Sequence, residues 1–232
     1  MAAKSLFFWL VVLPCQIGLA HASEGGIALM GTRIIHNADA ARSGIAVRNK
    51  STADSFLIQS WVENAAGGKS KDFFVAPPLY ISRPQTQNEV NIKFTGQADQ
   101  LPKDRETLYY FVEKTIPSID KSKVGKDVVL VAVATKLKLY YRPEGLKPLP
   151  RKAPEMLELI SENGELKIKN PTPYYVTLVN MSVDGKNIKD SMVSPFSALN
   201  IGVKYRGNRI KVIYSSLNDF GSKVGPYEKT TD

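Results

Sequence analysis

Short apolar segments, rich in Val, Ile, Leu, Tyr and Phe, recur between turn residues along most of this chain. Their length and spacing favour antiparallel β-sandwiches over parallel α/β units, and helical periodicity is weak. One segment, 154–160, fits a short helical turn and a strand equally well. We therefore predict an all-β protein built from β-sandwiches. The expected strands are Ile27–Ile35, Ile45–Arg48, Phe56–Val62, Asp72–Val75, Val90–Phe94, Thr107–Glu113, Val128–Tyr141, Leu166–Ile168, Tyr174–Met181, Ala198–Val203 and Arg209–Tyr214.

The first 22 residues have the pattern of a secretory signal peptide. A short basic start that includes Lys4 precedes a mostly apolar stretch, and 20–22 reads Ala-His-Ala, a small-x-small sequence that signal peptidases accept. We predict that residues 1–22 are removed on export. Beyond them, no apolar run approaches the ~20 residues that a membrane-spanning helix needs.

Cleavage would leave a chain with little chemistry for catalysis. The mature chain would contain His36 but no cysteine, because Cys15 lies in the signal peptide. Disulfides, thiolate-bound zinc and a cysteine nucleophile are thereby excluded, and the single histidine disfavours a periplasmic hydrolase. The mature net charge of about +8 is scattered along the chain. Its single cluster, 121–126, reads as a solvated loop rather than as a nucleic-acid site.

A proline-rich stretch near the middle divides the chain. Residues 142–151 contain three prolines in ten positions, which stiffens the backbone and removes hydrogen-bond donors. We interpret it as a semi-rigid linker between two sandwiches that meet at an angle. The predicted domains are 23–145 and 146–232.

The segment Asp127–Arg142 is unusual for a strand of a small sandwich. In its second half apolar and polar side chains alternate, with Leu137, Leu139 and Tyr141 on one face, whereas its first half is apolar on both faces. A central strand buried on both sides is one explanation. A strand whose second face or edge stays exposed until a partner covers it is the other. The residues alone do not choose between them.

Several motifs in order give the chain a resemblance to the periplasmic chaperones that assemble bacterial pili by the chaperone–usher route. The strongest is Leu101-Pro-Lys-Asp-Arg-Glu-Thr-Leu-Tyr-Tyr-Phe111 followed by Ile116-Pro117, and together the motifs span essentially the whole mature chain. The others are Gly31-Thr-Arg33, Ser60-Trp-Val-Glu-Asn64, Ala76-Pro-Pro78, Thr135-Lys-Leu-Lys-Leu-Tyr-Tyr-Arg-Pro143, Asn170-Pro-Thr-Pro-Tyr-Tyr175 and Asn218-Asp-Phe-Gly221.

Two features qualify the resemblance. After Phe111 the family signature continues with Asn and an aliphatic residue, whereas this chain has Val112 and Glu113. We therefore expect the end of that strand to pack differently. The loop 118–127 is only slightly longer than in the short-loop members, which places the chain in that group.

The resemblance implies a mechanism for the apolar segment. In such chaperones a strand is lent to a pilin subunit that lacks its own last strand, which is a form of β-augmentation. The matching donor positions are Val129, Val131 and Val133. Because Val133 and Leu137 share a face in a regular strand, odd-numbered donors require a bulge or twist near 134–136. Without one, Val128, Leu130 and Ala132 would face the subunit instead.

The resemblance also implies two charged sites. Arg33 and Lys138 match a basic pair that holds the C-terminal carboxylate of the subunit, and Glu106, Arg142 and Asp219 match an ion-pair trio between the domains.

The resemblance implies an all-β fold of two immunoglobulin-like sandwiches joined at an angle. It implies the function of a periplasmic chaperone without catalysis or cofactor. Its partners would be pilin subunits, an outer-membrane usher and, in the absence of subunit, a second chaperone molecule through the uncovered strand. Nucleic-acid binding and membrane insertion are not expected. A secreted immunoglobulin-like adhesin or carbohydrate-binding module is the alternative.

Overall fold

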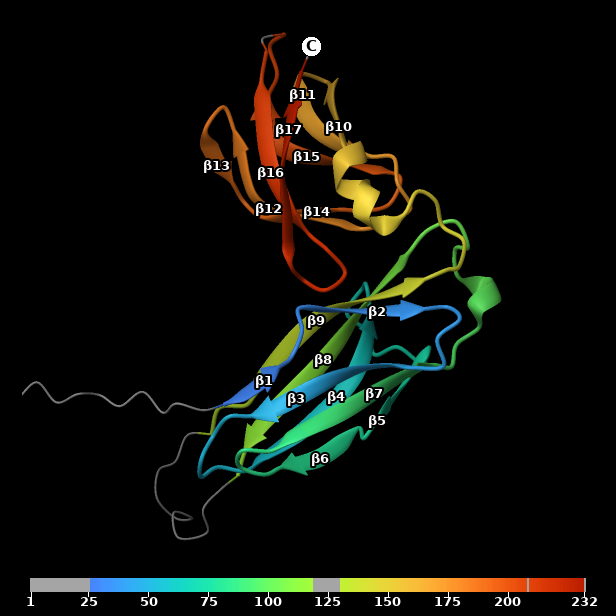
Figure 1. Cartoon of the computed structure of the whole chain (residues 1–232), viewed down its shortest axis with the longest axis vertical. Helices are drawn as coiled ribbons and strands as arrows, with labels where there is room; N and C mark the ends of the chain where they lie inside the picture. The colour runs from blue at the N-terminus through green and yellow to red at the C-terminus, as the bar shows by residue number, and fades with distance from the viewer. Residues whose placement is uncertain (1–25, 119–129, 208, 232) are drawn as a thin grey trace, which may run out of the picture.

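The protein consists of two β-sandwiches, one above the other in Figure 1. The computed structural model describes residues 26–118, 130–207 and 209–231. In the first sandwich a four-stranded sheet of order β1-β3-β7-β5 packs on a five-stranded sheet of order β2-β9-β8-β4-β6. The strands and the 3-10 helix of this part are β1 Ile27–Leu29, β2 Arg33–Asn37, β3 Ser43–Asn49, β4 Phe56–Asn64, β5 Phe73–Ala76, β6 Leu79–Ser82, β7 Gln87–Phe94, η1 Ala98–Gln100, β8 Thr107–Pro117 and β9 Val133–Arg142.

The second sandwich combines a three-stranded sheet, β10-β11-β15, with a five-stranded sheet in which β14 and β16 both pair with β12. It opens with the 3-10 helix η3, which follows the proline-rich linker. Its elements are η3 Pro150–Met156, β10 Glu158–Glu162, β11 Glu165–Asn170, β12 Val176–Val183, β13 Lys186–Ile188, β14 Ser191–Val193, β15 Ser197–Lys204, β16 Lys211–Leu217 and β17 Lys223–Thr230. The predicted all-β fold of two immunoglobulin-like sandwiches is confirmed, whereas the boundary at 145/146 stays a prediction.

The first predicted strand is in fact two strands in opposite sheets. β1 pairs with β3, whereas β2 pairs in parallel with β9, so the chain crosses between the layers at 30–32. Both pieces keep an apolar character because each faces the same core, which is why the sequence reads as one run. The ambiguous segment 154–160 also divides: η3 ends at Met156 and β10 begins at Glu158.

Each sandwich has its own apolar core, filled by alternate residues of its strands. The first core consists mainly of Ile34, Ile45, Val47, Val62, Phe73, Val75, Val90, Ile92, Tyr109, Phe111, Leu137, Leu139 and Tyr141. The second consists mainly of Leu157, Leu166, Ile168, Tyr174, Val176, Leu178, Met181, Val183, Val193, Val212 and Tyr214. Within the described residues, no helix is long and apolar enough to cross a membrane.

Glu113 occupies a core position in β8, two residues beyond Phe111 on the same face. Its side chain is buried, and its Oε2 has no hydrogen-bond partner among the described residues. Ser60 lies directly opposite on β4, and its buried hydroxyl is likewise unpartnered. Burial raises the pKa of the Glu113 carboxyl from 4.5 to about 7. The departure from the family signature thus places an ionisable group inside the first sandwich.

We predict that Glu113 makes the stability of this protein pH-dependent. Its pKa is higher in the folded than in the unfolded state, so its favourable contribution is complete below about pH 4.5 and is lost as the pH rises through about 7. Glu113→Leu should therefore be more stable than the wild type at pH 8 by about 2 kcal/mol, a figure reduced for solvent screening. Urea unfolding at pH 5 and pH 8 measures the difference.

Glu113→Gln is the matched control, since it keeps the shape and the polarity but cannot ionise. It should flatten the same pH profile. Parallel profiles for the wild type and Glu113→Gln would show that this carboxyl does not titrate in the range described.

Candidate functional site

Strand β9 is the element on which the candidate site is built. It lies between β2, to which it is parallel, and β8, to which it is antiparallel. From Leu137 onward its odd-numbered side chains are buried in the first core. The C-terminal half of β9 is thus an ordinary inner strand, fixed on both sides.

The N-terminal half of β9 still pairs with β8, but its side chains are not buried in the first core. All four residues from Val133 to Lys136 are exposed, and Val133 itself is 57% exposed. Just before the strand, Leu130 and Val131 are 45% and 64% exposed. The third predicted donor, Val129, lies outside the described residues. Of the two explanations for this apolar segment, burial on both faces is wrong for the described part of it.

The bulge expected near 134–136 is absent. The pairing of β9 with β8 is regular from Thr115 opposite Val133 to Thr107 opposite Tyr141. Val133 therefore shares a face with Leu137, and both are odd-numbered. Val133 and Thr135 are nevertheless exposed, so the odd-numbered face of β9 that is buried from Leu137 onward is uncovered in this half of the strand.

Arg33 and Lys138 lie side by side where the second half of β9 begins to pair with β2. They are direct partners in the parallel pair of β2 and β9. Arg33 Nη1 donates to the backbone oxygen of Leu217 at 3.1 Å, and Lys138 Nζ lies 3.4 Å from the hydroxyl of Thr177. Burial, together with the charge of Arg33, lowers the pKa of Lys138. Among the described residues neither cation has a carboxylate in ion-pair range. Two adjacent, partly buried cations without a counter-charge repel each other and attract an anion.

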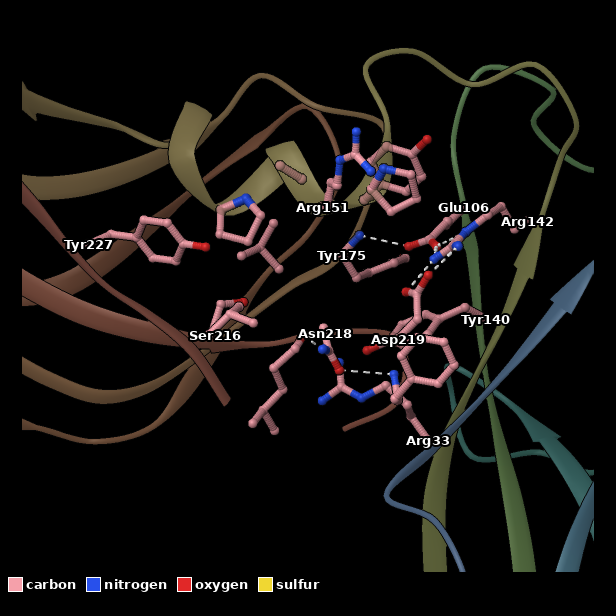
Figure 2. Close-up of a pocket in the computed structure, with 18 residues that line it drawn as sticks. Arg33, Glu106, Tyr140, Arg142, Arg151, Tyr175, Ser216, Asn218, Asp219 and Tyr227 are labelled. Carbon is pink, nitrogen blue, oxygen red and sulfur yellow. Dashed lines mark hydrogen bonds and ion pairs between the residues drawn. The ribbon is translucent and has the colours of Figure 1, made fainter. Parts of the chain in front are cut away.

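Arg142, the last residue of β9, connects the two sandwiches. Its Nε donates to Glu106 Oε1 at 2.8 Å, and its Nη1 and Nη2 donate to the two oxygens of Asp219 at 2.7 and 2.8 Å. Figure 2 shows its guanidinium between the two carboxylates. The structure brings the predicted trio together across the domain junction.

Within this trio Glu106 and Arg142 are the sheltered members, whereas the Asp219 side chain is 37% exposed. The Glu106 side chain is only 1% exposed, and its Oε2 also accepts the backbone N–H of Tyr175 in the second sandwich at 2.8 Å. Burial raises the pKa of Glu106, while the Arg142 charge and the Tyr175 N–H oppose that rise. Asp219 is positioned by a turn in which the Asn218 side-chain oxygen accepts from the N–H groups of Phe220 and Ser222.

Sequence reasoning missed several other contacts between the sandwiches. Tyr140 stacks on Tyr175 with ring centroids 5.4 Å apart, and its hydroxyl lies 3.2 Å from the sulfur of Met192. Gly221, with φ of +80°, lies so close to Thr32 that a Cβ there would overlap its hydroxyl. A tyrosine on the outer face of a strand reads as a half-exposed residue, so no signal in the sequence marks these contacts.

A cavity of about 230 Å³ opens at this junction (Figure 2). Its lining includes Arg33, Arg142 and Asp219 from the sites above, together with Tyr140 and Ser216. The Nε of Arg33 and the hydroxyl of Ser216 are buried without hydrogen-bond partners among the described residues. The junction is therefore both a structural contact and a hollow with unsatisfied donors.

Comparison with known proteins identifies the class to which this fold and site belong. Residues 26–147 match the family described as pili and flagellar-assembly chaperone, PapD N-terminal domain. Residues 152–227 match the family described as pili assembly chaperone PapD, C-terminal domain. The chain belongs to the pilus assembly chaperones, a family that is not enzymatic.

Individual relatives agree with the family. The chaperone protein FocC of Escherichia coli is 37% identical over 202 residues, which cover 86% of this chain and 88% of FocC. The crystal structure of the periplasmic chaperone SfaE is similar with a TM-score of 0.73 at 34% identity, covering 86% of this chain and 96% of SfaE. A structure of the Salmonella enterica SafA pilin in complex with the SafB chaperone is similar with a TM-score of 0.76 at 28% identity, covering 89% of this chain and 96% of the matched chain.

We predict that Arg142→Ala destabilises the protein and loosens the angle between its domains. It leaves the buried Glu106 carboxylate without its cation, which typically costs about 3–5 kcal/mol. Lys152→Ala, which removes an exposed pair with Glu155, is the control and should cost less than about 1 kcal/mol. Thermal melting and small-angle scattering measure the two effects. Unchanged melting together with unchanged scattering for Arg142→Ala would contradict the role of the trio.

Proposed function

We propose that this protein is a periplasmic chaperone that captures pilin subunits by donor-strand complementation and delivers them to an outer-membrane usher. Membership of the chaperone family supports the general function, and the complex of a related chaperone with the SafA pilin supports a pilin as the partner. The predicted signal peptide supports export. The alternative of an adhesin or a carbohydrate-binding module has no support from the family.

The observation that carries the mechanism is the course of β9. Its second half is a core strand, and its first half continues in register beyond the core with Val133 and, just before it, Val131 exposed. A subunit that lacks one strand of its own sandwich exposes an apolar groove and an unpaired strand edge. The projecting strand offers backbone hydrogen bonds for the edge and alternate valines for the groove.

Burial of the donor valines would contribute enough free energy to stabilise an incomplete subunit. Burial of a valine side chain contributes about 1.5–3 kcal/mol, so two or three valines supply a sizeable part of the stability of a small domain. The same exposed strand is expected to pair with a second chaperone molecule when no subunit is present.

The cation pair supplies the second half of the proposed mechanism. A subunit strand that lies beside β9 and reaches the valines would bring its C-terminal carboxylate to Arg33 and Lys138. Charge-assisted hydrogen bonds to this carboxylate are strong because both cations are partly sheltered from water. An end fixed there sets the register along the whole donor segment.

We predict that Lys138→Ala stays folded and loses subunit capture by about tenfold or more. It removes a charge that has no acidic partner within residues 26–118, 130–207 and 209–231, so stability should change little. Arg33→Ala should lose capture as well, with a small extra loss of stability because Arg33 also donates to Leu217 across the junction. Co-purification with a subunit and thermal melting measure the two effects.

A subunit whose C-terminus is amidated is the control for these variants. It should bind the wild type about as weakly as the carboxylate form binds Lys138→Ala. Wild-type levels of capture by both Ala variants would overturn the assignment of the anchor.

We predict that Val131→Glu leaves the chaperone folded, abolishes subunit capture and weakens self-association. The side chain is exposed in the free protein, whereas a carboxylate in the apolar groove of a subunit has a large desolvation cost. Leu130→Glu is the matched control, since Leu130 is also exposed but has the other parity. Capture assays and analytical ultracentrifugation measure the effects. Loss of capture for Leu130→Glu alone would transfer the donor role to even-numbered positions, and capture by both variants would exclude the donor mechanism.

A further inference from the structure

The outer face of β9 carries two lysines that are neighbours along the strand. Lys136 and Lys138 are two residues apart, and the regular pairing of β9 with Val112 and Tyr110 of β8 places both on the same face. A carboxylate could therefore be held at either lysine. The two positions differ by about 7 Å along the strand.

The choice between the two lysines decides the register of a bound strand. A carboxylate held at Lys136 would displace the subunit strand by two residues toward Val133. Because side chains alternate with a period of two, such a slip keeps every side chain on its own face. The apolar pattern of the subunit therefore does not reject it. The slipped register must therefore be disfavoured by the charges around the C-terminal carboxylate of the subunit.

The two lysines have different neighbours in the structure. Lys136 Nζ lies 2.5 Å from Glu63 Oε2, whereas Lys138 has no acidic partner among the described residues and stands beside Arg33. Glu63 is held in turn by the indole N–H of Trp61, which donates to its Oε1 at 2.9 Å. Its side chain is 11% exposed, and the hydrogen bonds from Lys136 and Trp61 lower its pKa, so it stays charged at neutral pH.

We propose that Glu63 is a register-determining residue: it neutralises Lys136, so that a subunit carboxylate is accepted at Arg33 and Lys138 and rejected two residues earlier. The inference rests on the proposed function and deepens it. At Lys136 an incoming carboxylate would meet the fixed negative charge of Glu63, whereas at Lys138 it meets two cations. A subunit carboxylate at Lys136 and the Glu63 carboxylate beside it repel each other, and the repulsion is stronger where both are sheltered from water.

The group of Trp61, Glu63 and Lys136 lies over the apolar Val112, so a test must separate the packing of these side chains from the charge of Glu63. Trp61 and Lys136 flank Val112 in the register, and Val112 is 1% exposed. Glu63→Gln keeps the shape of the side chain and an acceptor for the Trp61 indole while it removes the charge. It is therefore the variant that isolates the proposed role.

The test uses a pilin subunit in two forms, complete and without its last two residues, each mixed during refolding with the full-length mature chaperone. If the apolar side chains of the shortened subunit keep their usual positions against the donor strand, its carboxylate lies two residues earlier, at Lys136. We expect the wild type to capture the complete form and to discriminate against the shortened one. Glu63→Gln should reduce this discrimination about tenfold, by a gain in capture of the shortened form. Native mass spectrometry measures the ratio of the two complexes.

The double variant Glu63→Gln/Lys136→Gln should restore the discrimination, because the second anchor is then absent. An unchanged ratio in Glu63→Gln, or a reduced ratio that persists in the double variant, would overturn the proposal. If Glu63→Gln fails to fold, Trp61→Phe keeps the apolar cover but releases Glu63, and it should give a smaller gain in the same direction. Failure of the wild type to capture even the complete subunit would instead refute the proposed function.

Discussion

The ion pairs of Arg142 are the interaction on which the rest of the structure depends. Arg142 ends β9, and its guanidinium is held by Glu106 of the first sandwich and Asp219 of the second. Because Glu106 is also bound to the backbone of the second sandwich, the contact fixes both the distance and the angle between the domains. The pairing of β2 and β9 brings Arg33 and Lys138 together within the first sandwich, whereas the hollow beside Arg33 is lined by residues of both sandwiches and depends on that angle.

One strand therefore serves three purposes along ten residues. Its C-terminal residue joins the domains, its middle fills the core of the first sandwich, and its N-terminal residues project beyond that core. The three parts are coupled by a single regular register with β8. A shift of β9 at one end would displace the other end by the same amount, so the ion pairs that fix Arg142 also fix where the exposed valines stand.

The sequence predicted the architecture well because strands, turns and a proline-rich linker leave local patterns. It predicted the trio and the cation pair only through motifs, since Glu106, Arg142 and Asp219 are far apart in the chain and nothing local indicates that they meet. The expected bulge was wrong for a physical reason: periodicity gives the face of each residue but not the place where the core ends beneath the strand. Strands such as β17, with Lys, Pro and Glu among few apolar residues, were missed because they lack an apolar run.

The charges of this protein divide into two kinds with different consequences. Arg142 and Lys136 have carboxylate partners, and these pairs hold the frame and neutralise the surface around it. Arg33 and Lys138 are brought together by the pairing of β2 and β9, against their mutual repulsion, and neither has such a partner in the part of the chain that the structure describes. That arrangement is unfavourable in the free protein and becomes favourable when an anion arrives. In the proposed mechanism, a fold that neutralises Lys136 and leaves Arg33 and Lys138 without a carboxylate among the described residues concentrates the affinity for the subunit carboxylate at one point of the strand.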